Sequence, residues 1–178
     1  MRLRVHCEDW VLGDRGYGVA IGDAFSEVLV LHGVEGSWPL ELVTTHAVGV
    51  TPLPRWEGLS LGHDAYRLEI GPVTAYCESP LTMTAGPGEM TGVLSVDTYL
   101  APMDWPVTPG VVVRMWTEHR WYVQDPAQGG TWVFESPHAR YEGVTRVGLN
   151  RDEWPVPGET RREARTGVLL EVDVEPAG

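Results

Sequence analysis

The densest group of chemically active side chains in the sequence lies between Arg114 and Tyr122. This segment holds a carboxylate, an imidazole, two guanidinium groups and three aromatic rings within nine residues. Histidine changes its charge near neutral pH, and a neighbouring carboxylate can hold the imidazole in the orientation that proton transfer needs. We therefore predict His119 as a proton carrier and Glu118 as the residue that orients it, at the tip of a hairpin. The alternative is a solvated turn whose tryptophans pack into the core.

Asp97 and Tyr99 form a second candidate acid–base group. They lie two residues apart in a segment, 91–100, that alternates apolar and polar residues, so in an extended strand they share one face. An inward-facing Asp97 would be a buried carboxylate with a raised pKa, which suits a general acid or base. In the alternative interpretation, both residues belong to the solvent-facing side of that strand.

Other catalytic chemistries lack their sequence signals. The histidines and the two cysteines, Cys7 and Cys77, occur singly, without the close spacing of a zinc site, so no metal is predicted. The alternative is a metal site assembled from residues on distant strands. The chain contains no lysine, which excludes a Schiff base on a side-chain amine. No glycine-rich phosphate loop and no Gly-x-Ser-x-Gly elbow occurs, and no cofactor is predicted.

Tryptophan is the other abundant functional residue type, with eight in the chain. Tryptophan is enriched in cores and at binding surfaces because its ring buries a large area. Trp105 and Trp154 precede prolines, which favour extended loop structure, so we predict them as binding residues on loops. Trp38 also precedes a proline and is expected to be partly exposed. Trp116 and Trp121 are predicted near the base of the hairpin, as the walls of its mouth.

The elements that must position these side chains are strands. Arg2 to Cys7 alternates Leu3, Val5 and Cys7 against Arg2, Arg4 and His6, the period-two pattern of a half-buried strand. Similar short segments recur with glycine or proline between them, such as Gly71-Pro72, which predicts a turn or a bulge, and no long stretch has helical periodicity. We therefore predict an all-β chain, a single domain over residues 1–178, forming an antiparallel barrel or sandwich of about ten short strands with little helix. The other predicted strands are 25–31, 40–50, 66–70, 73–78, 91–100, 111–116, 120–123, 131–135, 141–149 and 167–174.

Charge and composition limit the classes of partner. The formal net charge is −12, and each third of the chain carries −4 of it. Nucleic-acid binding needs a basic face, so it is disfavoured. The one basic cluster, Arg161, Arg162 and Arg165, is expected to be a solvated loop. No membrane-spanning run and no secretory signal is found, so we expect a cytoplasmic protein with two buried, reduced thiols.

Both ends of the chain resemble an uncharacterised family of small proteins from high-GC bacteria, a domain of unknown function. The residues that carry the resemblance are Glu8-Asp9-Trp10, the Val19 to Asp23 segment and the last strand, Gly167 to Asp173. The family often has a cysteine pair in the loop after the tryptophan, whereas residues 12–16 contain none. The resemblance implies a compact β fold and carries no known activity.

These observations favour three kinds of function. The first is a binding module that captures a protein or small-molecule ligand through its tryptophan-bearing loops. The second is a small cofactor-independent enzyme of the cyclase or isomerase type, with an aromatic-lined cavity and acid–base groups such as Asp97, Tyr99 or His119. The third is an acidic inhibitor or immunity-type protein, for which the even charge distribution is a poor match. An internal cavity with an inward carboxylate would favour the second function.

Overall fold

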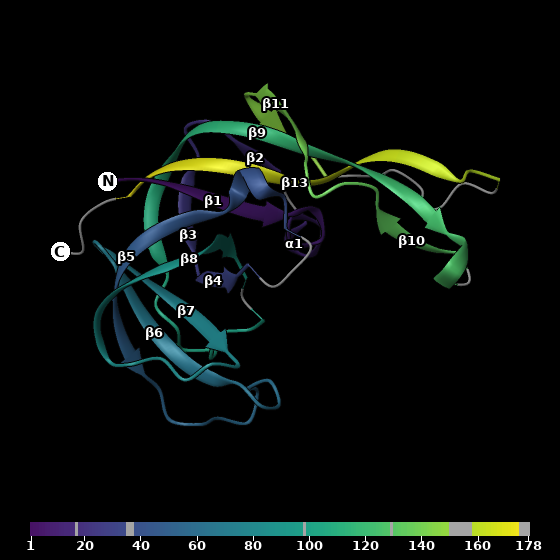
Figure 1. The fold of residues 1–178 in the computed structure, drawn as a ribbon. Helices are drawn as coiled ribbons and strands as arrows, with labels where there is room; N and C mark the ends of the chain where they lie inside the picture. Colours follow the sequence, from purple (N-terminus) through teal and green to yellow (C-terminus); the bar gives the residue numbers. More distant parts are fainter. Residues whose placement is uncertain (17, 35–37, 98, 129, 150–157, 175–178) are drawn as a thin grey trace.

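The computed structural model describes residues 1–16, 18–34, 38–97, 99–128, 130–149 and 158–174. Strands dominate the described residues, and one short α-helix and two 3-10 turns are the other elements (Figure 1). The prediction of an all-β barrel with little helix is confirmed. The elements are β1 (Arg2–Glu8), α1 (Asp9–Arg15), β2 (Val19–Ala20), β3 (Ala24–Glu27), β4 (Leu29–Gly33), η1 (Leu40–Leu42), β5 (Thr44–Pro52), β6 (Asp64–Ile70), β7 (Val73–Ser79), β8 (Gly86–Val96), β9 (Thr108–Asp125), η2 (Pro126–Gln128), β10 (Thr131–Phe134), β11 (Arg140–Val144), β12 (Arg146–Val147) and β13 (Arg161–Val174).

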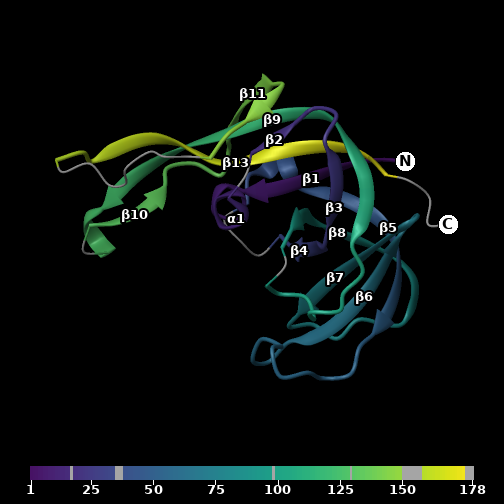
Figure 2. The same cartoon turned by 180° about the vertical axis from the view of Figure 1, so that it is seen from behind.

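Five strands close into a barrel in the order β8–β4–β7–β6–β5, because β8 pairs with both β4 and β5. The barrel occupies the lower part of Figures 1 and 2. The predicted turn at Gly71-Pro72 is confirmed, since Ile70 pairs directly with Val73 and Gly71 has φ 59°. Only glycine adopts that backbone conformation at little cost, so the tight corner between β6 and β7 depends on it.

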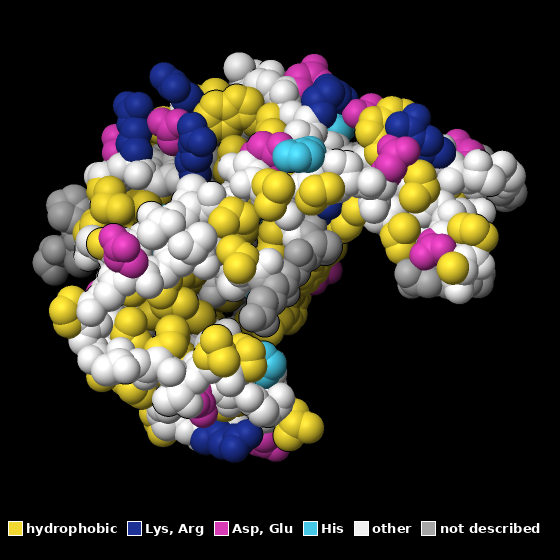
Figure 3. Space-filling view, viewed as in Figure 1, with side chains coloured by type: hydrophobic (Ala, Val, Ile, Leu, Met, Phe, Trp, Pro, Cys, Tyr) yellow, Lys and Arg dark blue, Asp and Glu magenta, His cyan; other side chains and the backbone are white. Residues whose placement is uncertain are grey.

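A second group of strands extends the sheet away from the barrel in the order β8–β1–β13–β9. β9 curves along the whole upper edge of the molecule and carries β10 at one end, which forms a projecting arm (Figures 1 and 2). The surface is hollowed between this arm and the barrel (Figure 3). Most pairing is antiparallel, as predicted, but β1 pairs with β8 and β4 pairs with β7 in parallel.

The predicted hairpin between 111 and 123 is wrong, because this segment is one continuous strand, β9. Thr117, Glu118 and His119 pair with β13 on one side and with β11 on the other. Tight hairpin loops usually need a residue that accepts positive φ, most often glycine, and this tripeptide has none. Backbone hydrogen bonding on both sides therefore keeps the tripeptide extended, and Glu118 and His119 are in mid-strand rather than at a tip.

Several other strand boundaries differ from the predictions. The run 25–31 is divided between β3 and β4, and β8 ends at Val96 instead of Leu100. β13 begins at Arg161, so the arginine cluster is part of a strand and not a solvated loop. Its three guanidinium groups lie within ion-pair distance of carboxylates, namely Arg161 with Glu135, Arg162 with Glu159 and Arg165 with Asp9.

β1 shows how the alternation works and where it fails. Leu3, Val5 and Cys7 point into the main core, as predicted, and Cys7 is a buried thiol like Cys77. Arg2 and Arg4 on the other face are exposed, yet His6 on that same face is only 3% exposed. Something must therefore cover the outer face of β1 at His6.

Candidate acid–base site

The group that meets His6 is the carboxylate of Glu118 from β9. The Nε2 atom of His6 lies 3.1 Å from Oε2 of Glu118, and the two side chains are 3% and 2% exposed. Both ring nitrogens of His6 are buried, and neither makes a hydrogen bond of good geometry with a described residue, so Nε2 approaches Glu118 closely without pointing its N–H directly at it. Burial of two opposite partial charges at this distance makes their attraction stronger than it would be in water. β1 and β9 therefore bring together an imidazole and a carboxylate that are 112 positions apart in the sequence.

Two hydroxyl groups hold the Glu118 carboxylate in place. Thr166 donates a 2.6 Å hydrogen bond to Oε1, and Tyr141 donates a 3.2 Å bond to Oε2. Thr166 is the extra residue of a β-bulge in β13, where the pairing with β9 shifts between Arg165 and Gly167. Bulges are common beside functional sites because they redirect a side chain, and this one aims a hydroxyl at Glu118.

These contacts determine the charge state of the carboxylate. Burial alone would raise the pKa of Glu118, but hydrogen bonds and charge interaction with His6, together with Thr166 and Tyr141, lower it below its ordinary value of 4.5. Burial and the negative Glu118 also raise the pKa of Tyr141, so its hydroxyl stays protonated and donates. Glu118 is thus an ionised, hydrogen-bonded partner for His6 at neutral pH.

Gly167 leaves the space that His6 occupies. A Cβ atom at this position would lie 2.5 Å from Nε2 of His6 and 2.9 Å from the backbone oxygen of Cys7. Both distances are shorter than carbon makes with a non-bonded neighbour, so any larger residue would displace the imidazole or β1. The glycine is therefore required by the close approach of the ring and not by an unusual φ.

The His6–Glu118 pair lines a partly enclosed cavity of about 420 Å³. Its walls come from β1, β9, β10 and the segment that contains Trp38 and Pro39. The guanidinium carbon of Arg120 lies 3.2 Å from the centre of the Phe134 ring, and Phe134 packs on Tyr122 at 4.7 Å. Arg120 is also buried and donates a hydrogen bond to the backbone oxygen of Ser136 at 3.1 Å. The cavity therefore combines aromatic faces with one cationic group.

Trp38 covers the outer face of β1. Its ring contacts His6 edge-on at 5.5 Å and lies 4.9 Å from the ring of His32 in β4. The sequence prediction that Trp38 is partly exposed agrees with its intermediate burial. Its contact with two imidazoles could not be anticipated, because it depends on the parallel pairing of β1 with β8, which pairs in turn with β4.

The predicted pairing of Glu118 with His119 is wrong. Successive residues in a strand point to opposite faces, and the imidazole of His119 instead contacts the hydroxyl of Thr117 at 3.1 Å between Nε2 and Oγ1. Glu118 does face a cavity, but its imidazole partner is His6. The structure therefore places a different histidine beside Glu118 from the one in the prediction.

Asp97 and Tyr99 do not share a strand face, because β8 ends at Val96. Asp97 accepts hydrogen bonds from the backbone N–H groups of Tyr99 and Leu100, at 2.8 and 3.3 Å, as in an Asx turn. The Tyr99 side chain is 64% exposed, and its hydroxyl donates to Asp14 at 2.5 Å. Both residues have local structural contacts, and neither lines the cavity of His6 and Glu118.

The tryptophans predicted to bind a ligand are dispersed. Trp105 is half-buried, packs on Tyr76 at 5.3 Å and lies under the guanidinium of Arg67. Trp116 is half-buried on β9, and Trp121 is exposed on the same strand under Arg161. Trp154 lies outside the described residues. None of the three described tryptophans lines the His6–Glu118 cavity, in which Trp38 and Trp10 take part instead.

The described part of the chain has neither a metal-binding cluster nor a membrane-spanning helix. No group of three or more histidine, cysteine, aspartate or glutamate side chains there could hold a metal ion. No helix in that part of the chain is long and apolar enough to cross a membrane.

Comparison with known proteins adds no relative. No family model matches the sequence, and neither the curated proteins nor the solved structures include a match. The resemblance of the two chain ends to an uncharacterised bacterial family stays a prediction. What the fold and the site define is a class: an all-β barrel protein with a buried histidine–glutamate pair in an aromatic-walled cavity.

The alternation in β1 predicts that His6 is exposed, because the other residues on that face of the strand are arginines. Trp38 and β9 bury this face, and their contact with it is a long-range effect that the local pattern does not contain. Tyr141 and Thr166 carried no local signal at all, because each acts through a strand pairing with β9.

Proposed function

We propose that this protein is a small enzyme that transfers a proton to or from an organic ligand bound in the His6–Glu118 cavity. The supporting observation is a buried imidazole that lies 3.1 Å from an ionised carboxylate and has no hydrogen bond of good geometry to a described residue at either ring nitrogen. Such a pair at the wall of a cavity of about 420 Å³ is the arrangement that general acid–base catalysis requires.

The roles follow from the contacts. We assign His6 as the proton carrier because its side chain lines the cavity and its Nε2 lies against Glu118, which leaves Nδ1 as the atom that would accept a proton. Glu118 is a positioning residue that fixes the ring and stabilises the imidazolium formed after proton transfer, as the carboxylate does in other histidine–carboxylate pairs. Thr166 and Tyr141 hold the carboxylate so that little reorganisation accompanies the change in charge.

The walls of the cavity favour an aromatic or enolisable ligand. Phe134 and Tyr122 line the cavity with aromatic surface, and the positive charge of Arg120, which also lines it, would stabilise an oxyanion that develops when a proton is removed. The reaction class is therefore an isomerisation, cyclisation or elimination that needs only proton transfer. The interpretation as a binding module has less geometric support, because Trp105 packs against the barrel instead of projecting from a loop.

The test uses 5-nitrobenzisoxazole, a small planar probe whose only chemical demand is a base. His6 would remove the proton from C3, the electron pair of that C–H bond would form the nitrile, and the N–O bond would break to leave a coloured nitrophenolate. We expect turnover above the rate in buffer, and we expect Glu118→Gln and His6→Gln each to lower kcat/KM by about 100-fold, the usual contribution of a general base.

Matched variants separate catalysis from folding. Glu41→Gln removes the carboxylate of a surface histidine–glutamate pair and should leave kcat/KM unchanged. Tyr141→Phe keeps the ring and removes one hydrogen bond to Glu118, so we expect a smaller loss and a circular dichroism spectrum like that of the wild type. Turnover that is absent in the wild type, or equal in the wild type and in folded His6→Gln, would contradict the proposal.

A further inference from the structure

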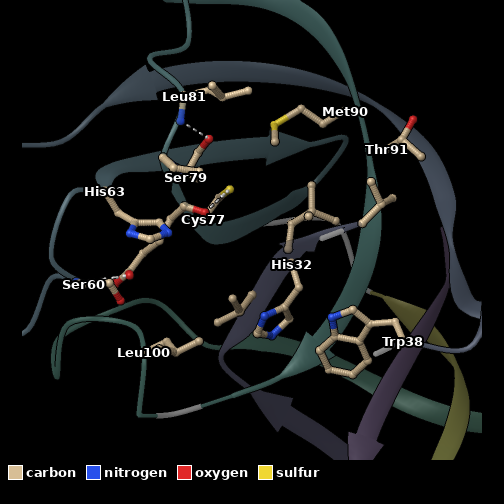
Figure 4. A pocket seen from close by; sticks show the side chains of 16 residues that line it. His32, Trp38, Ser60, His63, Cys77, Ser79, Leu81, Met90, Thr91 and Leu100 are labelled. Carbon is tan, nitrogen blue, oxygen red and sulfur yellow. Dashed lines mark hydrogen bonds between the residues drawn. The ribbon is translucent and has the colours of Figure 1, made fainter. Parts of the chain in front are cut away.

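A second cavity, of about 380 Å³, is also lined by Trp38 (Figure 4). Its walls come from β4, β7 and β8 of the barrel and from the segment that contains Ser60 and His63. Trp38 is the one side chain that lines both this cavity and the His6–Glu118 cavity, in the part of the chain that the structure describes. We refer to the second cavity as the His32 cavity, after the histidine whose ring packs on Trp38 at a tilt of 44°.

The lining of the His32 cavity is almost without charge. Glu78 is the only carboxylate among the described lining residues, and no arginine lines the cavity. Both oxygens of Glu78 already accept protein hydrogen bonds, from the Tyr76 hydroxyl at 3.0 Å and from the Ser60 backbone N–H at 3.2 Å. An anion would meet no cation here, and the one carboxylate is already held in place by the protein.

The titratable groups of the wall support the same conclusion. Burial lowers the pKa of His32, although Asp97 and Glu78 oppose the shift, so the imidazole is neutral at neutral pH. Burial, with the neighbouring charge of Glu78, raises the pKa of the Cys77 thiol to about 12. The cavity therefore presents a neutral ring and a neutral thiol to a ligand.

The aromatic rings and hydrogen-bonding groups in the wall of the His32 cavity indicate the shape of a ligand that would fit it. The Trp38 and His32 rings lie 4.9 Å apart, and a hydrogen bond between Nε2 of His32 and the Ser95 hydroxyl, at 2.7 Å, fixes the imidazole. Figure 4 places the imidazole of His63 on a different wall from that of His32, and Leu100 and Met90 supply apolar surface between the polar groups. Flat ring faces with a hydrogen-bonding imidazole at the edge suit a planar ligand.

We propose that the His32 cavity binds an uncharged, planar aromatic or heteroaromatic molecule, packed against Trp38 and hydrogen-bonded at its edge by His63. This site is additional to the His6–Glu118 cavity and does not depend on proton transfer there.

The test measures binding of 1-aminoanthracene, a planar dye that is uncharged at neutral pH and fluoresces in apolar sites. We expect saturable binding to the wild type and at least a tenfold weaker affinity in Leu100→Trp, which places an indole in the His32 cavity. The matched control, Val107→Trp, adds the same ring at a half-exposed aliphatic residue outside both cavities and should bind like the wild type. Equal affinity in the two tryptophan variants would overturn the proposal.

Two further measurements make the result specific. The anionic dye 1-anilinonaphthalene-8-sulfonate should bind at least tenfold more weakly than 1-aminoanthracene, and equal affinity would contradict an uncharged ligand class. Glu118→Gln should bind 1-aminoanthracene with wild-type affinity, so a failed proton-transfer assay and a failed second site are distinguishable. Loss of dye binding in folded Glu118→Gln would place the dye in the other cavity and would overturn the proposal.

Discussion

Two histidine–glutamate pairs among the described residues differ in their surroundings. His138 and Glu41 approach to 2.7 Å on the surface, with side chains 62% and 39% exposed. His6 and Glu118 are farther apart, at 3.1 Å, but are almost fully buried. Both glutamates have a pKa below the ordinary value, since hydrogen bonding outweighs the opposing effect of burial in each.

The comparison shows that the distance between the two charged groups does not by itself determine how much such a pair contributes to stability. Water and salt screen the exposed pair, so its attraction contributes little to stability. The buried pair lies in a medium of lower dielectric, where the attraction is strong and where an unmatched partner is costly. The shorter contact therefore joins two surface segments, whereas the longer one defines a site.

The largest expected effect comes from breaking the buried pair. Glu118→Gln removes the charge that His6 faces and leaves a buried amide that Thr166 and Tyr141 only partly satisfy, so we expect a loss of about 3 kcal/mol in the free energy of unfolding. Urea unfolding at pH 7 measures it. A loss no greater than that of Glu41→Gln would remove the distinction between the two pairs.

The next largest effect is expected from a steric change beside the buried pair. Gly167→Ala would place a methyl group 2.5 Å from the His6 ring and 2.9 Å from the Cys7 carbonyl oxygen, and overpacking of this kind costs about 2 kcal/mol. Gly143→Ala is the matched control on β11, because its Cβ would meet only Trp116, at 3.8 Å, an ordinary contact. Thermal unfolding of both variants checks the prediction, and equal melting temperatures would show that β1 yields without strain.

The sequence allowed the fold class to be predicted because alternation is local. Leu3, Val5 and Cys7 enter the core as their spacing indicates, and the Gly71-Pro72 corner follows from backbone geometry. The length of β9 could not be predicted in this way, since the extended shape of Thr117 to His119 comes from partners on β11 and β13. Those partners lie far along the chain, and no local propensity encodes them.

The candidate site was predictable only in part, for the same reason. The residue types around Glu118 indicated acid–base chemistry, and Glu118 does face a cavity. Its partner could not be read from spacing, because His6 is distant in sequence and lies on the nominally polar face of β1. Burial of that face by Trp38 and the bulge at Thr166 are consequences of tertiary structure.

Lowering the pH gives a further test of the buried pair, and we expect a smaller change in the free energy of unfolding than for the two substitutions above. A carboxylate whose pKa is lower in the folded than in the unfolded protein adds stability that is complete above the unfolded pKa and is lost as the pH falls through the folded pKa. The stability advantage of the wild type over Glu118→Gln should therefore shrink as the pH falls below about 4.5. Urea unfolding between about pH 4.5 and about pH 3 checks it, and an advantage that grows as the pH falls through this range would mean that the pKa of Glu118 is not lowered in the folded protein.

The smallest expected effect belongs to the exposed pair. His138→Ala removes the imidazole that contacts Glu41, and we expect the free energy of unfolding to change by at most about 0.5 kcal/mol, because exposed ion pairs contribute little. The change should become smaller still in about 1 M NaCl, where the Debye length falls to about 3 Å. The loss in Glu118→Gln should persist in the same salt, since buried pairs are screened much less. Equal sensitivity of the two variants to salt would mean that water reaches Glu118, and burial would then no longer account for the difference between the pairs.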